Sequence, residues 1–114
     1  MIHYADRLFR AIVTKGDGDV GGDTLFRYDQ RGSVLMGSYS GGDIDYGSLV
    51  GSVRADGSLY FLYHHITKSG LLRSGLCESR PEILPSGKIR LHEQWQWTSG
   101  LGVGDRGTSI LEEI

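Results

Sequence analysis

Hydrophobic and polar residues alternate along most of this chain of 114 residues. Residues 88–99, KIRLHEQWQWTS, show the alternation most clearly. One side of this segment carries apolar residues and a single carboxylate, namely Ile89, Leu91, Glu93, Trp95 and Trp97. Because successive side chains of a strand point to opposite faces, the period of two predicts a β-strand. No window of eleven or more residues has the spacing of an amphipathic helix.

The same alternation recurs in short segments separated by turn residues. It predicts strands over residues 7–14, 24–30, 33–40, 46–54, 58–67, 71–79, 88–99 and 108–114. Residues 80–87 begin and end near prolines, which cannot donate to a ladder, so they predict an edge or a short irregular strand. No segment could serve as a parallel crossover. We therefore expect an all-β protein with one domain over residues 1–114, an antiparallel up-and-down meander that closes into a barrel of eight to ten strands. A β-sandwich is the alternative.

The amino-acid composition indicates many turns and argues against some classes of binding partner. The 18 glycines are dispersed, and only 2 residues are proline, which favours many short turns over a flexible linker. A net charge of −2 gives no basic surface for nucleic acid or an anionic membrane. The longest apolar runs are too short to span a bilayer, and the first ten residues lack the pattern of a signal peptide. A single cysteine, Cys77, excludes an intrachain disulfide framework and fits a cytoplasmic location.

Residues 14–24, TKGDGDVGGDT, contain the pattern G-x-G-x-x-G and also three spaced aspartates. A dinucleotide site needs a helix directly after its glycines, but the segment that follows alternates like a strand. A calcium loop that started at Asp17 would need an oxygen ligand and a glutamate where Gly21 and Tyr28 stand. We therefore interpret the segment as a glycine-rich hairpin loop. A lid at the mouth of the barrel is a second hypothesis for it.

Three runs carry a resemblance to a known family: YSGG at 39–42, PEILPSGKIRL at 81–91 and EQWQWTSG at 93–100. Over nearly its whole length the chain resembles a family of small bacterial proteins often given the name N-acetylglutamate synthase, which implies acyl transfer. An acetyl-CoA site of the usual kind has the segment Q/R-x-x-G-x-G/A before a helix. The nearest segments, residues 54–59 and 97–102, depart from it at Leu59 and Trp97, and neither precedes a helical pattern. In shape, the predicted meander is similar to lipocalin, fatty-acid-binding and avidin barrels, a likeness of fold alone.

Strand parity predicts which side chains face the interior. Besides the face that contains Glu93, we expect these residues inside: Thr24, Phe26, Tyr28, Gln30, Leu35, Gly37, Tyr39, Leu59, Phe61, Tyr63, His65, Thr67, Arg73, Gly75, Cys77 and Ser79. Apolar residues with a few polar groups are typical of a ligand pocket. The candidate ligand-binding residues are Arg10, Tyr28, Tyr39, Tyr63, His65, Cys77, Glu93 and Trp95. A solid core, in which Glu93 bonds to tyrosine hydroxyls or to Arg10, is an equally good interpretation.

Several reactive arrangements can be drawn from the same residues. His64 and His65 are adjacent in a strand and point to opposite faces, so they cannot bind one ion together. A metal site from His65, Cys77 and Glu93 would need three strands to converge. A nucleophile–base pair of Cys77 with His65, or an acid–base pair of Glu93 with His65, is also conceivable. We assign no catalytic residue, metal or cofactor from these patterns.

We expect a cytoplasmic barrel that binds a small hydrophobic or aromatic molecule in its interior. Neither nucleic acid nor a membrane is an expected partner. One alternative is an enzyme such as an acyltransferase, with Glu93 or His65 as its base. The other is a packed barrel that acts through its surface, as a homodimer or as a protein-interaction module.

Overall fold

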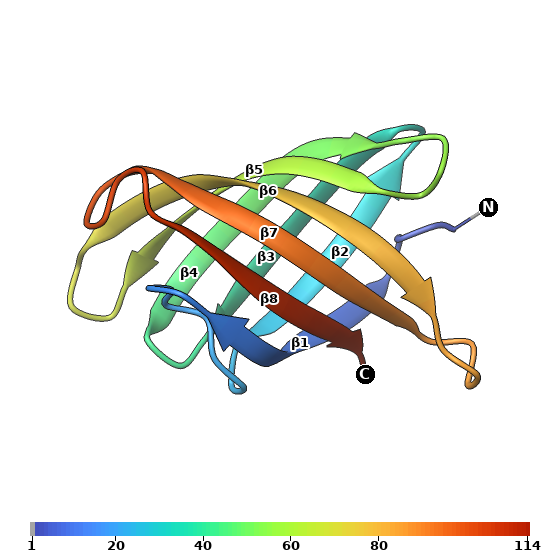
Figure 1. Ribbon diagram of the computed structural model, residues 1–114, viewed down its shortest axis with the longest axis horizontal. Coiled ribbons are helices and arrows are strands. Elements are labelled where there is room, and N and C mark those ends of the chain that lie inside the picture. The colour runs from blue at the N-terminus through green and yellow to red at the C-terminus, as the bar shows by residue number, and fades with distance from the viewer. Residues whose placement is uncertain (1) are drawn as a thin grey trace.

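The computed structural model describes residues 2–114, which form eight antiparallel strands closed into one barrel (Figure 1). The strands are β1 (Arg7–Lys15), β2 (Leu25–Arg31), β3 (Val34–Gly41), β4 (Ile44–Val53), β5 (Leu59–Thr67), β6 (Leu72–Ile83), β7 (Ile89–Ser99) and β8 (Arg106–Glu113). Each strand pairs with the next one in the chain, and β8 pairs with β1 to close the sheet. The predicted fold class is therefore confirmed, with a strand number at the lower end of the expected range. Among the described residues, the structure contains no helix that could cross a membrane.

The prediction for residues 80–87 was wrong in one respect. These residues do not start a separate element, because β6 continues without a break to Ile83 and pairs with β7 along this stretch. Pro81 lies opposite Leu91 of β7, whereas the pairing of β6 with β5 ends at Ser79 and Leu59. Residues 80–83 therefore have a neighbouring strand on one side only, which is where a sheet tolerates a proline.

The two ends of the barrel are built differently. At one end, here called the closed end, the segment before β1 folds under the barrel near the turns that join β2 to β3 and β4 to β5. Tyr4 is fully buried there, its hydroxyl donates to the Gly57 carbonyl (2.6 Å), and its backbone N–H donates to Gln30 (2.9 Å). Large apolar side chains fill this end, namely Phe9, Leu35, Leu59, Ile89, Leu91 and Leu111.

The opposite end, here called the loop end, carries the connections of residues 16–24, 42–43, 68–71 and 100–105. Figure 1 shows the two ends apart along the long axis, with both termini toward the right and the connection between β7 and β8 at the left. Every residue that parity placed inside is buried or half-buried in the structure. The alternating pattern thus fixes which side chains meet in the interior, and the plug at the closed end leaves the loop end as the way in.

Candidate functional site

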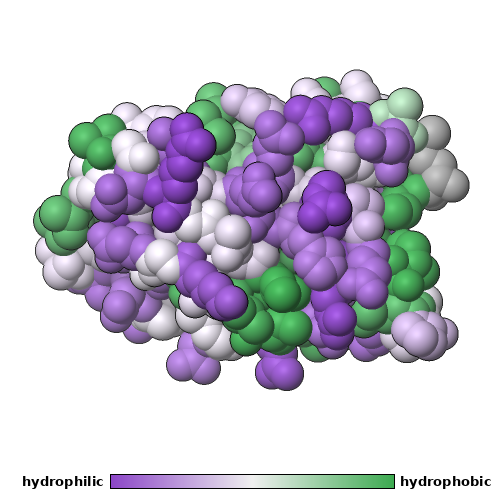
Figure 2. All heavy atoms as spheres, viewed as in Figure 1, coloured by the Kyte–Doolittle hydropathy of each residue, from purple (hydrophilic) through white to green (hydrophobic). Residues whose placement is uncertain are grey.

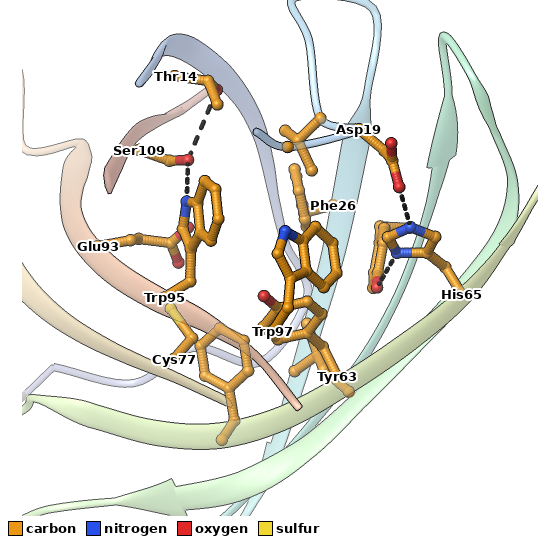
Figure 3. Close-up of a pocket in the computed structure, with 15 residues that line it drawn as sticks. Thr14, Asp19, Phe26, Tyr63, His65, Cys77, Glu93, Trp95, Trp97 and Ser109 are labelled. Atoms are coloured by element: carbon orange, nitrogen blue, oxygen red, sulfur yellow. Dashed lines mark hydrogen bonds and ion pairs between the residues drawn. The ribbon is translucent and has the colours of Figure 1, made fainter. Parts of the chain in front are cut away.

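A cavity of about 40 Å³ lies inside the barrel toward the loop end (Figure 3). Its walls are largely aromatic, with rings from Phe26, Tyr39, Phe61, Tyr63, Trp95 and Trp97. Its polar groups come from Thr14, Asp19, His65, Cys77, Glu93 and Ser109. This volume is enough for roughly three water molecules, since a water needs about 10–15 Å³ of such space. The interior is thus neither fully packed with side chains nor open enough to form a wide binding pocket.

Most of the candidate ligand-binding residues meet at this cavity. Six of the eight line it: Tyr39, Tyr63, His65, Cys77, Glu93 and Trp95. Tyr28 is fully buried but is not part of the lining. The placement of Arg10 in the interior was wrong, because Phe9 and Ala11 point inward and the residue between them faces solvent. The period of two, applied to β1, would have found this error.

Glu93 is the most unusual group in the lining. Its side chain is buried, and Ser79 Oγ donates to Glu93 Oε2 over 2.7 Å. Neither Arg10 nor any other basic side chain of the described residues forms an ion pair with it, contrary to one expectation above. Burial raises the pKa of Glu93 to about 7, against the smaller opposing effect of hydrogen bonds from Ser79 and neighbouring groups. Near neutral pH this carboxyl group is therefore partly protonated.

The groups next to Glu93 are themselves uncharged. Burial raises the pKa of the Cys77 thiol well above its usual value, so this thiol is not an activated nucleophile. Burial likewise raises the pKa of the Tyr28 hydroxyl, which lies near Glu93 but has no hydrogen-bond partner of good geometry among the described residues. An orphaned polar atom at this depth is uncommon in proteins, because each one costs free energy. The Tyr28 hydroxyl therefore leaves hydrogen-bonding capacity unused next to Glu93.

His65 is held by two partners. Its Nδ1 is 2.9 Å from the Tyr39 hydroxyl, and its Nε2 is 2.8 Å from Asp19 Oδ2 (Figure 3). Burial lowers the pKa of His65 and so favours the neutral imidazole. Asp19 has a smaller effect in the opposite direction. These partners fix the tautomer, with Nε2–H donating to Asp19 and Tyr39 donating to Nδ1. Both ring nitrogens are thus in use, and neither is free to act as a base toward Cys77 or Glu93.

The loop of residues 16–24 covers the cavity as well as turning the chain. Asp19 accepts from Arg73 Nη1 (3.2 Å) in addition to His65, and the Asp17 carbonyl accepts from Trp97 Nε1 (2.7 Å). Gly18 and Asp19 form part of the cavity wall. The lid hypothesis therefore describes the closed arrangement better than a plain hairpin turn does.

Asp19 and Arg73 were missing from the residues assigned to the site. Arg73 is buried, and its guanidinium carbon lies 3.6 Å from the centre of the Trp97 ring. A sequence signal for this pair existed, because parity placed Arg73 inside and a buried arginine requires an acidic partner. The aspartates of the neighbouring loop were the available choice.

Glycines in the strands set the positions of the aromatic rings. A Cβ atom at Gly47, Gly75 or Gly107 would collide with the ring of Tyr39, Tyr63 or Trp95, respectively. Each ring lies across the glycine of an adjacent strand, where a side chain would otherwise stand. The high glycine content therefore shapes the cavity wall as well as the turns.

The alternative motifs find no structural support. Residues 54–59 comprise the turn between β4 and β5 and the first residue of β5. Residues 97–102 lead from β7 into its connection with β8, so neither segment precedes a helix. Within residues 2–114, no group of three or more His, Cys, Asp or Glu side chains is arranged to hold a metal ion.

Comparison with known proteins agrees with the barrel. Residues 2–114 match the family model described as avidin-like protein. No curated protein and no solved structure matches the chain. The expected likeness to avidin barrels is thus confirmed, whereas these comparisons give no support to the name N-acetylglutamate synthase.

The raised pKa of Glu93 predicts a specific dependence of stability on pH. Between the usual glutamate pKa of 4.5 and about 7, the folded chain holds a proton that the unfolded chain releases. Stability from this group is therefore present at low pH and is lost as the pH rises through that window, by about 3 kcal/mol in total. Glu93→Gln should abolish this loss, so that the variant gains about 2–3 kcal/mol relative to wild type between pH 5 and pH 8.

Urea unfolding of both proteins at the two pH values measures this difference. The control is Glu78→Gln, which removes an exposed carboxylate on the outer face of the neighbouring strand. Parallel stability curves for wild type and Glu93→Gln would show that Glu93 is not held in its neutral form.

Proposed function

We propose that this chain, which belongs to the avidin-like protein family, binds a small hydrophobic or aromatic molecule in the cavity at the loop end. The observation that carries the proposal is a largely aromatic wall around open space, with a few polar groups directed into it. Glu93 and Tyr63 would orient the molecule, and Trp95 would contact it. A cytoplasmic location, in which Cys77 stays a free thiol, is part of the same proposal.

The volume of the cavity limits what can bind while the loop is closed. About 40 Å³ admits a compact group, and a larger molecule requires residues 16–24 to move. Side-chain bonds to the barrel wall hold this loop at two places. Near its middle they join Asp19 to His65 and Arg73, and Asp17 to Trp97 and Arg73. At its end, the Thr24 hydroxyl donates to the Gly41 carbonyl. Four glycines give its backbone freedom to move. We infer that the loop opens to admit the ligand and closes over it.

The two tryptophans of the chain give a direct test of binding, because both line the cavity. We expect toluene or cyclohexanol to shift both indole N–H signals in a ¹H–¹⁵N spectrum, with saturation. Biotin is a third, larger probe. All three probes exceed the roughly three water molecules that the closed cavity holds, so each requires residues 16–24 to move, and biotin requires the widest opening. Leu49→Phe adds volume to the cavity wall and should weaken binding about tenfold or more, the equivalent of about 1.4 kcal/mol.

The matched control for this test is Val34→Phe, on the neighbouring strand β3. Val34 is exposed and does not line the cavity, so enlarging it should leave the affinity unchanged. If none of the three probes gives a saturable shift of either indole signal in the wild-type protein, the cavity is not a binding site for such molecules.

A second proposal concerns the outer face of β4, β5 and β6. Large apolar side chains lie there in two groups, with the hydrogen-bonded pair of Ser48 and His64 between them. In one group Ile66 pairs with Tyr46 and Leu72, and in the other Val50 pairs with Leu62. These five apolar residues, here called the outer patch, are 36–70 % exposed and together present on the order of 500 Å². By contrast, the face with β7 and β8 in front is mostly hydrophilic (Figure 2).

We propose a second copy of this chain as the occupant of the outer patch. A standard interface buries about 800 Å² on each partner, which the outer patch and its polar border can supply. The net charge of −2 opposes self-association only weakly. The barrel would then act as a homodimer, with the two loop ends left free.

Light scattering coupled to size-exclusion chromatography tests the homodimer. We expect twice the chain mass of 12.5 kDa for the wild type and the single mass for Leu62→Glu, because a charge would be buried in the interface. Leu101→Glu places the same charge on an exposed loop position and should leave the dimer intact. A wild-type protein that stays monomeric at high concentration would contradict this proposal.

A further inference from the structure

We propose that the cavity selects organic cations of the substituted-ammonium class over neutral molecules of the same shape. This inference rests on the proposed function, because it specifies the charge of a ligand that the cavity is proposed to bind. Three features of the site carry it: the angles between the aromatic rings, the sign of the charged groups around the cavity, and the size of the space.

The aromatic rings meet at steep angles. The ring centroids of Trp95 and Trp97 are 5.6 Å apart with an interplanar angle of 56°, and those of Tyr63 and Trp97 are 5.5 Å apart at 67°. These three rings all line the cavity, so they border the small space from different directions. The face of an aromatic ring carries negative electrostatic potential, and several such faces attract an ammonium group strongly once water is excluded.

The charged groups around the cavity have the same sign as these ring faces. The ionisable side chains of the lining are acidic, phenolic or thiol groups, apart from His65, which its surroundings keep neutral. Glu93 lies inside the barrel without a cation, and Asp19 lies at the loop end. Arg73 is not part of the lining, although its guanidinium carbon lies 3.6 Å from the centre of the Trp97 ring. Its charge is balanced by Asp19 (3.2 Å) and Asp17 (3.7 Å). A cation in the cavity would therefore meet the carboxyl group of Glu93, which has no ion-pair partner within residues 2–114, and no cationic side chain among the lining residues.

The size of the cavity agrees with a compact head group. About 40 Å³ accommodates a group the size of a methylated ammonium, whose remaining chain can extend past Asp19 toward solvent. Asp19 is half-buried, which leaves this end of the cavity partly accessible. A fused ring system would require more space than the closed loop leaves.

Binding of a cation would change the protonation of Glu93. The titratable groups that face it are Tyr28 from β2, Tyr39 from β3, Tyr63 from β5 and Cys77 from β6, and burial raises the pKa of each, so all four remain neutral. The remaining strands contribute Thr14, Leu49 and Ser109, which do not titrate. Below pH 7 the neutral carboxyl group must therefore release one proton to solvent when the cation binds, and above pH 7 it releases none.

Choline and 3,3-dimethylbutan-1-ol form a matched pair of probes, because the second compound replaces the ammonium nitrogen with carbon. We expect choline to bind at least tenfold more tightly than the alcohol at pH 8, as measured by the shifts of the two indole N–H signals. The affinity for choline should fall about a hundredfold from pH 8 to pH 5, given a Glu93 pKa of about 7. The affinity for the alcohol should not depend on pH in this way.

Two further measurements assign this preference to Glu93. In the Glu93→Gln variant, the preference for choline should fall to the smaller part that the aromatic rings supply, whereas Glu78→Gln on the outer face should retain the full preference for choline. Titration calorimetry of the wild type in buffers of different ionisation enthalpy should show close to one proton released per choline at pH 6 and none at pH 8.5. The calorimetry needs no variant, so it remains decisive if Glu93→Gln does not fold.

The outcomes separate this inference from the proposed function. Equal binding of both compounds at pH 8, or a preference for choline that is undiminished in Glu93→Gln, would overturn the inference and leave a small-molecule site. Binding of toluene or cyclohexanol without binding of either compound of the pair would also overturn it. If no probe of either experiment binds, both proposals fail.

Discussion

The buried carboxyl group of Glu93 is the constraint on which the rest of the site depends. It lies on an inward position of the longest predicted strand segment, among residues that would otherwise make an apolar row. Burial without a cation favours the neutral form by about 3 kcal/mol, an effect that Ser79 reduces but does not cancel. A barrel selected only for stability would carry an apolar residue here. The dependence of stability on pH and the proposed charge preference both follow from keeping a carboxyl group at this position.

Asp19 shows how the same chemical group behaves with partners. It binds His65 and Arg73 at once, so its charge is balanced, and it ties a glycine-rich loop to the barrel wall. The barrel thus separates two tasks along its axis. Tight packing around Tyr4 stabilises the closed end, while polar contacts and open space are concentrated at the loop end. Natural sequences depart from ideal packing mainly where a function requires it, and here the departure lies at one end only.

The sequence predicted the fold and the inward side chains well, because both depend on a local period of two. It failed where neighbours distant in the chain decide the outcome. Asp19 and Arg73 are 54 residues apart, so no local pattern predicts their contact. The inward position of Arg73 did indicate that an acidic partner was needed. Residues 80–83 were not predicted to continue the preceding strand, because the end of β5, which leaves Pro81 on an open edge, is set by pairing between strands. The cavity volume could not be predicted either, since it depends on how the aromatic rings lie over Gly75 and Gly107.

The account depends most on the raised pKa of Glu93, which keeps this carboxyl group neutral below pH 7 and partly protonated near physiological pH. A ¹³C NMR titration of the side-chain carboxyl carbons, with the Glu93 signal assigned by comparison with Glu93→Gln, measures this directly in the free protein. The account predicts a midpoint close to 7, well above the usual glutamate pKa of 4.5. A midpoint near 4.5 would contradict it, because the carboxylate would then be ionised and well solvated, and the cavity would offer no unsatisfied charge to a ligand.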